Sequence, residues 1–175
     1  MVEIRFHARA GQGAKTAAQI LAEAALKENQ FVQAFPNFGP ARRGAPVSSF
    51  VRLSEQPIDL HSQITEPDFV VVMDLTLLDN EAVTIGVTSQ TKILINSPRP
   101  QPRGETLDAS KIAQHFLGKN RPNLVMLGAL VKKLGNLVSL KSLEKAITES
   151  FESRWGLQLT QKNILAMRQG YQEVR

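Results

Sequence analysis

The chain has 175 residues, a formal net charge of +5 and no cysteine. This length suits a single domain over residues 1–175 that buries a core without cross-links. The lack of cysteine excludes disulfides, a thiolate nucleophile and cysteine-ligated zinc or iron–sulfur clusters. No apolar run approaches the ~18 residues of a membrane helix, and the start does not resemble a signal peptide, so a cytoplasmic protein is expected. The modest positive charge only weakly favours an anionic partner.

The first part of the chain is typical of an α/β unit. Residues 2–9 alternate apolar and polar side chains, which predicts a strand with one apolar face. The glycine-containing loop 10–13 follows, and apolar residues between positions 17 and 25 then recur at helical spacing. A short strand is expected near Phe31–Ala34. Residues 35–46 hold three prolines and two glycines, which predicts an irregular loop.

The middle of the chain carries further strand signals. Residues 47–54 favour a strand, and residues 69–73 and 92–96 are apolar runs typical of strands buried on both faces. These two runs end in the polar residues Asp74 and Asn96. Residues 97–107 are rich in proline and polar groups and are expected to form an exposed excursion.

Helical signals dominate the remainder. Asp108 can cap a helix that reaches about Leu117, and Pro122 or Asn123 can start another. Residues 124–134 are apolar on nearly all sides, which predicts a helix buried in a core or against another chain. Ser139 and Thr160 can cap two further helices. The expected fold is a single Rossmann-like α/β domain, with a mostly parallel sheet flanked by helices and a helical C-terminal half.

The glycine loop is the first candidate site, with Gly11, Gln12, Gly13, Lys15 and Thr16 as its candidate residues. Glycines after a strand allow a tight turn, and the following helix N-terminus offers free N–H groups to a phosphate. The run matches neither a Walker loop nor a dinucleotide fingerprint, because the glycines these need are missing and no acidic residue stands near the second strand. A tight turn without a ligand is the competing interpretation.

A second candidate site is the pair Arg42 and Arg43 with Gly44 beside it. Two adjacent guanidinium groups suit a phosphate or a carboxylate, because arginine binds such groups through two parallel hydrogen bonds. The pair could bind a ligand, meet acidic groups across a subunit contact, or belong to a solvated loop. The prolines and aromatic residues around it favour an ordered loop.

The other polar residues give weaker signals. Helix capping is the favoured role for Asp74 and Asn96, although ligands of parallel sheets do bind at that edge. His7, His61 and His115 lack the spacing of metal ligands. No catalytic constellation stands out, and the lysines near the C-terminus lack the interleaved aromatic residues of a nucleic-acid surface.

Several runs together resemble the gamma subunit of pyruvate (2-oxoacid) ferredoxin oxidoreductases. They are residues 5–25, 32–47, 70–78 and 123–131, in the family's order, with a weaker similarity at 166–171. The resemblance implies an enzyme complex that oxidatively decarboxylates a 2-oxoacid, transfers the acyl group to coenzyme A, and passes electrons to ferredoxin or flavodoxin. It also implies that thiamine diphosphate, magnesium and iron–sulfur clusters belong to the partner alpha, beta and delta subunits.

For this chain, the resemblance implies a non-catalytic subunit that shares in coenzyme A binding and assembly, without catalytic or metal-ligating residues of its own. The matched positions in the glycine loop would contact coenzyme A, and Arg42, Arg43 and Gly44 would close over the same ligand. Pyruvate is the favoured oxoacid. A purely structural subunit, a homodimer in isolation and a stand-alone nucleotide-binding domain stay open, whereas nucleic-acid and membrane partners are not expected.

Overall fold

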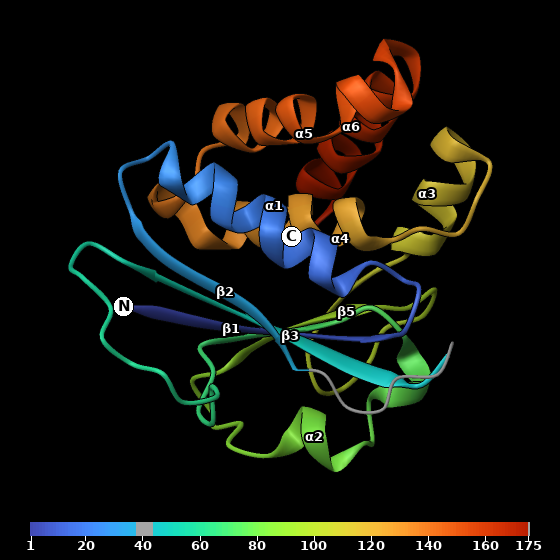
Figure 1. Cartoon of the computed structure of the whole chain (residues 1–175). Helices are drawn as coiled ribbons and strands as arrows, with labels where there is room; N and C mark the ends of the chain where they lie inside the picture. Colours follow the sequence, from blue (N-terminus) through green and yellow to red (C-terminus); the bar gives the residue numbers. More distant parts are fainter. Residues whose placement is uncertain (38–43, 175) are drawn as a thin grey trace.

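The computed structural model describes residues 1–37 and 44–174. Among these residues the strands form one sheet in the order β2-β3-β1-β4-β5-β6 (Figure 1). The pairs β1–β4, β4–β5 and β5–β6 are parallel, whereas β1–β3 and β2–β3 are antiparallel. The predicted fold class, an α/β domain with a mostly parallel sheet, is therefore confirmed. The strand bounds are β1 Val2–Arg9, β2 Phe31–Asn37, β3 Pro46–Ser54, β4 Phe69–Val72, β5 Lys92–Asn96 and β6 Glu105–Leu107.

In the described part of the chain, most of the helices lie on one face of the sheet, whereas α2 with neighbouring loops lies on the other (Figure 1). Helices α1 and α4 lie next to the sheet, and α5 and α6 pack on them from outside. The helix α4 is buried from Leu124 to Val131, so its apolar circumference serves a core position. The helix bounds are α1 Ala14–Leu26, α2 Glu81–Thr84, α3 Ala109–Leu117, α4 Asn123–Leu134, α5 Leu140–Trp155 and α6 Leu157–Glu173, with short 3₁₀ turns at Leu75–Leu77 and Gly135–Leu137.

Two glycines set the close crossing of α4 and α6. A Cβ atom on Gly128 would lie 2.1 Å from the carbonyl oxygen of Met167, and one on Gly170 would lie 2.1 Å from that of Val125. Real Cβ atoms do not approach that closely, so each helix backbone needs glycine where it meets the other. The crossing therefore holds the C-terminal half of α6 close against α4.

Several sequence-based predictions of local structure are confirmed. Asp108 and Ser139 cap α3 and α5, accepting hydrogen bonds from the N–H groups of Lys111 and Ser142. Pro122 stands at the N-cap of α4, which begins at Asn123. In the described part of the chain, no helix is long and apolar enough to cross a membrane.

Three local predictions were wrong. The second strand continues to Asn37, into the segment expected to be loop, because it pairs with β3 along its whole length. Residues 105–107 form the edge strand β6 on β5, within the predicted exposed excursion. Thr160 does not cap a helix: α6 begins at Leu157, and the Thr160 hydroxyl donates within the helix to the carbonyl of Gly156. The two strand predictions failed because these segments become strands by pairing with residues far away in the sequence.

Candidate functional site

The glycine loop connects the end of β1 to the start of α1. Gly11 and Gly13 have φ angles of +102° and +88°, a region that side chains with a Cβ rarely adopt. Gly13 is the N-cap of α1 and provides no capping side chain. A Cβ atom at this position would also lie 2.5 Å from Nδ2 of Asn123. The loop therefore brings an uncapped helix N-terminus, with its partial positive charge, against the start of α4.

Gln12 braces this loop. Its Oε1 accepts a hydrogen bond from the N–H of Arg9 at 2.7 Å, and its Nε2 donates to Oδ2 of Asp74 at 2.7 Å. Both ends of the amide are thus engaged within the protein. Although Gln12 was a predicted ligand residue, its hydrogen bonds give it a positioning role that ties the loop to the end of β4.

Asp74 is the centre of the same bracing network. Its Oδ1 accepts from the backbone N–H and the hydroxyl of Thr76, at 3.0 and 2.5 Å, as expected for a cap. The Arg9 guanidinium donates to the Thr76 hydroxyl and lies 3.7 Å from the Asp74 carboxylate. Partial burial raises the pKa of Asp74, but hydrogen bonds from Thr76 and Gln12 and the charge of Arg9 bring the pKa below its usual value. The carboxylate is therefore ionised and structural.

The second predicted loop meets the first at Gly44. The Ala10 N–H donates to the carbonyl of Ala45 at 2.8 Å, and the Gly44 N–H donates to the carbonyl of Ala10 at 3.3 Å. Arg9 adds a hydrogen bond from its Nη1 to the Gly44 carbonyl at 3.0 Å. The end of the second loop therefore lies beside the glycine loop, as predicted. Arg42 and Arg43 lie outside the described residues.

A cavity of about 380 Å³ opens beside the glycine loop, and we call it the cationic cavity. Three of its lining residues, Lys119, Arg121 and Arg154, carry positive charge, and none of the described residues that line it carries a carboxylate. Its lining residues are Gly11, Gln12, Gly13, Thr16, Leu117, Lys119, Arg121, Asn123, Leu124, Phe151, Arg154, Trp155, Leu159 and Asn163. Concentrated positive charge at a helix N-terminus is suited to an anion such as a phosphate.

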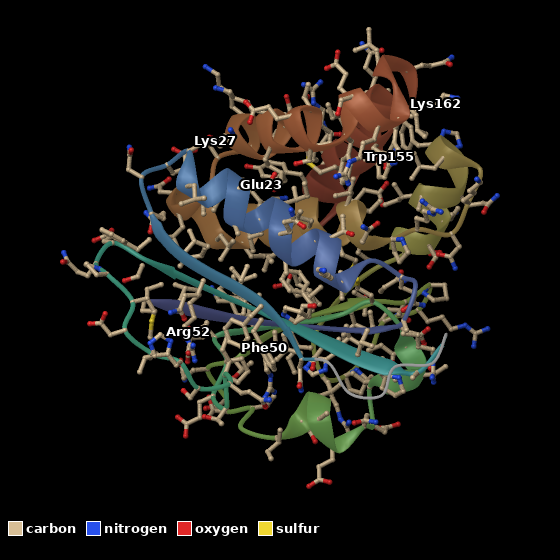
Figure 2. All side chains as sticks on the ribbon, in the orientation of Figure 1. Glu23, Lys27, Phe50, Arg52, Trp155 and Lys162 are labelled. Carbon is tan, nitrogen blue, oxygen red and sulfur yellow. The ribbon has the colours of Figure 1, made fainter. Side chains whose placement is uncertain are left out.

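An aromatic pair forms part of the same wall. The rings of Phe151 and Trp155 stack with centroids 3.9 Å apart and planes 4° apart. Phe151 is buried, whereas Trp155 is 37% exposed at the end of α5, where Figure 2 labels it. A rigid, partly exposed indole backed by a second ring offers a flat surface on which a planar ring can stack.

The charged and aromatic part of this cavity was not predicted from the sequence. Lys119 and Arg121 stand between α3 and α4, and Arg154 and Trp155 end α5. Local signals for both segments existed: a basic run directly before a helix start, and a basic–aromatic pair followed by Gly156 at a helix junction. Neither signal says that the segments meet, because that depends on how α4, α5 and α6 pack.

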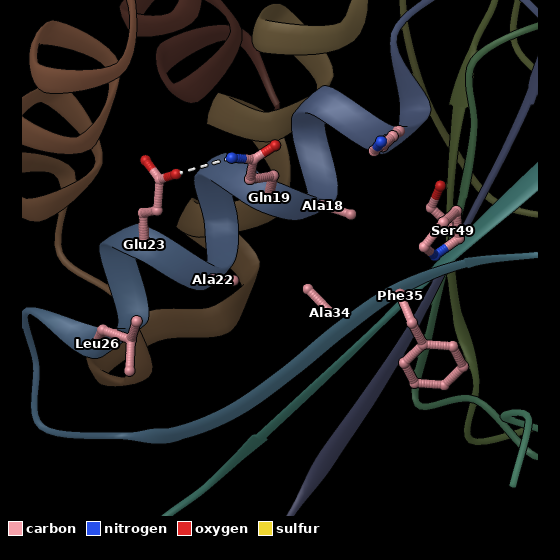
Figure 3. A pocket seen from close by; sticks show the side chains of 10 residues that line it. Ala18, Gln19, Ala22, Glu23, Leu26, Ala34, Phe35 and Ser49 are labelled. Carbon is pink, nitrogen blue, oxygen red and sulfur yellow. Dashed lines mark hydrogen bonds between the residues drawn. The ribbon is translucent and has the colours of Figure 1, made fainter. Parts of the chain in front are cut away.

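Lys15 differs from the other residues predicted in the loop. Gly11, Gln12, Gly13 and Thr16 line the cationic cavity. Lys15 instead lines a groove of about 200 Å³ between α1 and β2, whose other side chains Figure 3 shows. Successive residues at a helix start point in different directions, so the loop presents its backbone and Thr16 to the cavity and Lys15 to a different surface.

The remaining candidates have structural roles. Asn96 donates to the Met73 carbonyl and to the Ser110 hydroxyl, each at 2.9 Å, and accepts from the Ser110 N–H at 3.1 Å. It thus ties β5 to the first turn of α3 at the sheet edge. His7 is buried, and burial and the nearby charge of Arg5 lower its pKa to about 4. In the described residues, no cluster of three or more acidic or histidine side chains is placed to hold a metal ion.

Comparisons with known proteins agree with this architecture. The family described as "Pyruvate ferredoxin/flavodoxin oxidoreductase" matches residues 3–173. The common gamma subunit of pyruvate/ketoisovalerate oxidoreductases from Pyrococcus furiosus is 42% identical, over 99% of this chain and 97% of that one. The crystal structure of the pyruvate oxidoreductase subunit PORC from Thermotoga maritima aligns with a TM-score of 0.86 and 38% identity, over 99% of this chain and 97% of that one.

One solved complex shares the fold at low identity. It is a 2-oxoglutarate:ferredoxin oxidoreductase from Magnetococcus marinus, described with 2-oxoglutarate, coenzyme A and succinyl-CoA bound. The TM-score is 0.82 at 19% identity, and the match covers 97% of this chain but 30% of the longer one. A unit with this fold therefore occurs as one part of a larger oxidoreductase chain.

Proposed function

The chain belongs to the pyruvate ferredoxin/flavodoxin oxidoreductase family as the gamma subunit of a 2-oxoacid:ferredoxin oxidoreductase complex, and from this premise we propose that it holds the phosphate-bearing end of coenzyme A. The reaction of such a complex is the oxidative decarboxylation of a 2-oxoacid with transfer of the acyl group to coenzyme A. The 2-oxoacid is pyruvate in this proposal, in keeping with the names of the relatives.

The observation that carries the proposal is the chemistry of the cationic cavity. Coenzyme A ends in a pyrophosphate, a ribose phosphate and an adenine, so its binding site needs several positive charges and a flat apolar surface. Lys119, Arg121 and Arg154 supply the charges, and the N-terminus of α1 adds backbone donors at the glycine loop. Trp155 supplies a surface for the adenine. Gly44 lies beside the glycine loop, and in this proposal Arg42 and Arg43, which are outside the described residues, would contact the same ligand.

The division of labour follows from the composition of the chain. Because the chain has no cysteine, it cannot ligate an iron–sulfur cluster in the usual way. In this proposal the clusters belong to the partner alpha, beta and delta subunits, as do the thiamine diphosphate and its magnesium. Electrons leave through those subunits to ferredoxin or flavodoxin. This subunit's own contribution is to bind and orient the acyl acceptor, which lowers the entropic cost of the transfer step.

The test uses the assembled enzyme with Arg121→Ala and Arg154→Ala, made singly and together. Each loss of a charge-assisted hydrogen bond should raise the apparent KM for coenzyme A by about tenfold or more. Arg121→Lys and Arg154→Lys should recover part of the affinity, because the charge remains. Lys111→Ala removes an exposed cation on α3 outside the cavity and serves as the matched control. Arg42→Ala with Arg43→Ala tests the second loop in the same assay.

Two readouts separate this proposal from its alternatives. Dye reduction with the 2-oxoacid but without coenzyme A should stay within about twofold, because the removed groups do not touch the decarboxylation step. An unchanged coenzyme A dependence in an assembled double variant would overturn the binding role. Loss of co-elution with the partner subunits would favour a purely structural subunit, and tight nucleotide binding by an isolated monomer would favour a stand-alone binding domain.

A further inference from the structure

The antiparallel helices α5 and α6 form the outermost layer of the molecule (Figure 1). A groove of about 540 Å³ lies between them. We call it the α5–α6 groove, lined by Lys141, Glu144, Lys145 and Thr148 of α5 and by Gln161, Ile164, Leu165 and Arg168 of α6. Within each helix these residues follow the spacing i, i+3, i+4, i+7, so each set forms one continuous stripe. The core faces of the same helices carry other side chains, such as Leu143, Ile147 and Met167.

The groove has an apolar centre and a cationic end. Ile164 and Leu165 lie in the middle, and Leu165 is 47% exposed. Because the helices run antiparallel, Lys141 and Lys145 near the start of α5 lie toward Arg168 near the end of α6. The neutral residues Thr148 and Gln161 form the opposite end.

The single carboxylate among the lining residues does not cancel this charge. Glu144 receives two hydrogen bonds from Arg168, at 2.5 and 2.8 Å, so these two charges neutralise each other. Lys141 and Lys145 then remain as a local excess of positive charge. Among the described residues, Lys145 makes a long ion pair of 3.9 Å with Glu149, whose carboxylate is 2.5 Å from Lys27. The cationic end therefore favours negatively charged groups on whatever covers the apolar centre.

We propose that the α5–α6 groove docks an acidic amphipathic helix of another subunit of the oxidoreductase complex. Two stripes on neighbouring helices, each about two turns long and meeting at the apolar pair Ile164 and Leu165, form the seat that a third helix needs. The apolar side chains of the incoming helix cover Ile164 and Leu165, and its carboxylates face Lys141 and Lys145. A second copy of this chain is a poorer occupant, because its own groove would bring like charges together.

The docking site is separate from the cationic cavity. On α6, Leu159 and Asn163 line that cavity, whereas Gln161, Ile164, Leu165 and Arg168 line the groove. The inference rests on membership of a multisubunit family and does not depend on coenzyme A binding. A variant of the groove that still assembles at high subunit concentration should keep the wild-type KM for coenzyme A, which distinguishes failure of one proposal from failure of the other.

Site-directed cross-linking tests which segment covers the groove. Because the chain has no cysteine, Leu165→Cys can be labelled with a benzophenone maleimide before the other purified subunits are added. Leu60→Cys is the matched control, since Leu60 is 46% exposed but lies between β3 and β4. Irradiation of the Leu165→Cys complex should give cross-links to an acidic, helical segment of a partner subunit, identified by mass spectrometry. Cross-links to a second copy, to a basic segment, or none above the control would overturn the proposal.

Charge reversal tests the electrostatic part. Lys145→Glu should weaken binding to the remaining subunits by about tenfold at low salt, and the difference from wild type should shrink as salt is added. Lys111→Glu, an exposed lysine on α3, should leave the affinity within about twofold. Both residues are exposed, so the far-ultraviolet circular dichroism of each variant should match the wild type. Equal affinity of Lys145→Glu and wild type would overturn the charge complementarity.

Discussion

The strand β1 has two buried faces of opposite chemistry. Ile4, Phe6 and Ala8 face the helices, and each is fully buried among apolar side chains. Arg5 and His7, on the alternate positions, are 2% and 4% exposed on the other side of the sheet. The central polar positions of the alternation are therefore covered almost as completely as the apolar ones, by α2 and the loops near it.

The difference comes from what each covering layer can offer to a polar group. The backbone N–H and C=O groups of a helix bond to each other, so a covering helix offers few acceptors to the sheet. The sheet face that it covers must therefore be apolar. The short α2 and its flanking residues leave carbonyls available, and Arg5 donates to those of Val83 and Ile85 at 3.1 and 2.7 Å. The guanidinium of Arg52 on β3, which Figure 2 labels, is 1% exposed and is instead satisfied by a neighbouring strand, since it lies 2.7 Å from the Glu3 carboxylate of β1. A buried polar face is possible where irregular structure covers it.

The largest expected effect is on the apolar face. Phe6→Ala should lower the free energy of unfolding by about 4 kcal/mol, because it leaves a cavity that the packed helices cannot fill. Urea denaturation followed by circular dichroism measures the change. Phe31 lies on the edge strand β2 and is 46% exposed. Phe31→Ala should therefore lower the free energy of unfolding by less than about 1 kcal/mol. Equal losses for the two variants would contradict the assigned faces.

On the polar face, the loss of one ionic partner should have the next largest effect. Glu3→Ala leaves the buried Arg52 guanidinium without its carboxylate and should lower the free energy of unfolding by about 3 kcal/mol. Arg52 would keep its 3.1 Å hydrogen bond to Gln33, which does not neutralise the charge. The double variant Glu3→Ala with Arg52→Met should be more stable than Glu3→Ala alone. A double variant whose loss equals the sum of the single losses would show that the pair is not coupled.

A smaller, pH-dependent effect should arise from His7. Its pKa is lowered to about 4 in the folded protein by burial and by Arg5, against about 6.5 when the chain is unfolded. Between these values the unfolded state binds the proton and the folded state does not, so stability falls as the pH decreases. From pH 7.5 to pH 5 the His7 contribution should decline by about 2 kcal/mol.

Urea denaturation across this pH range, compared with His7→Gln, isolates the contribution. The variant lacks the titrating group and should show a correspondingly shallower pH dependence. His61 and His115 are exposed and remain in both proteins, which makes the difference specific to the buried position. Parallel stability curves for the two proteins would contradict a depressed pKa for His7.

The sequence determined much of this protein through rules that act over a few residues. The alternation in residues 2–9, the glycines after it and the helical spacing that follows predicted β1, the loop and α1. Asp108 and Ser139 marked helix starts, because a cap depends on a bond to a residue three positions away. The apolar circumference of residues 124–134 predicted a helix buried in a core or against another chain, and α4 lies in the core.

Only the tertiary structure decided which segments meet. The strand β6 and the last residues of β2 exist because neighbouring strands pair with them, and their own composition favours loops. The alternation of β1 did not reveal that the middle of its polar side, at Arg5 and His7, is buried as well. Lys119, Arg121 and Arg154 carry no periodic signal, and they converge on the glycine loop because α4, α5 and α6 pack in one particular way. Local backbone preferences and hydrophobic periodicity depend on residues that are close together in the sequence. The convergence of charges depends on long-range packing, which no short stretch specifies.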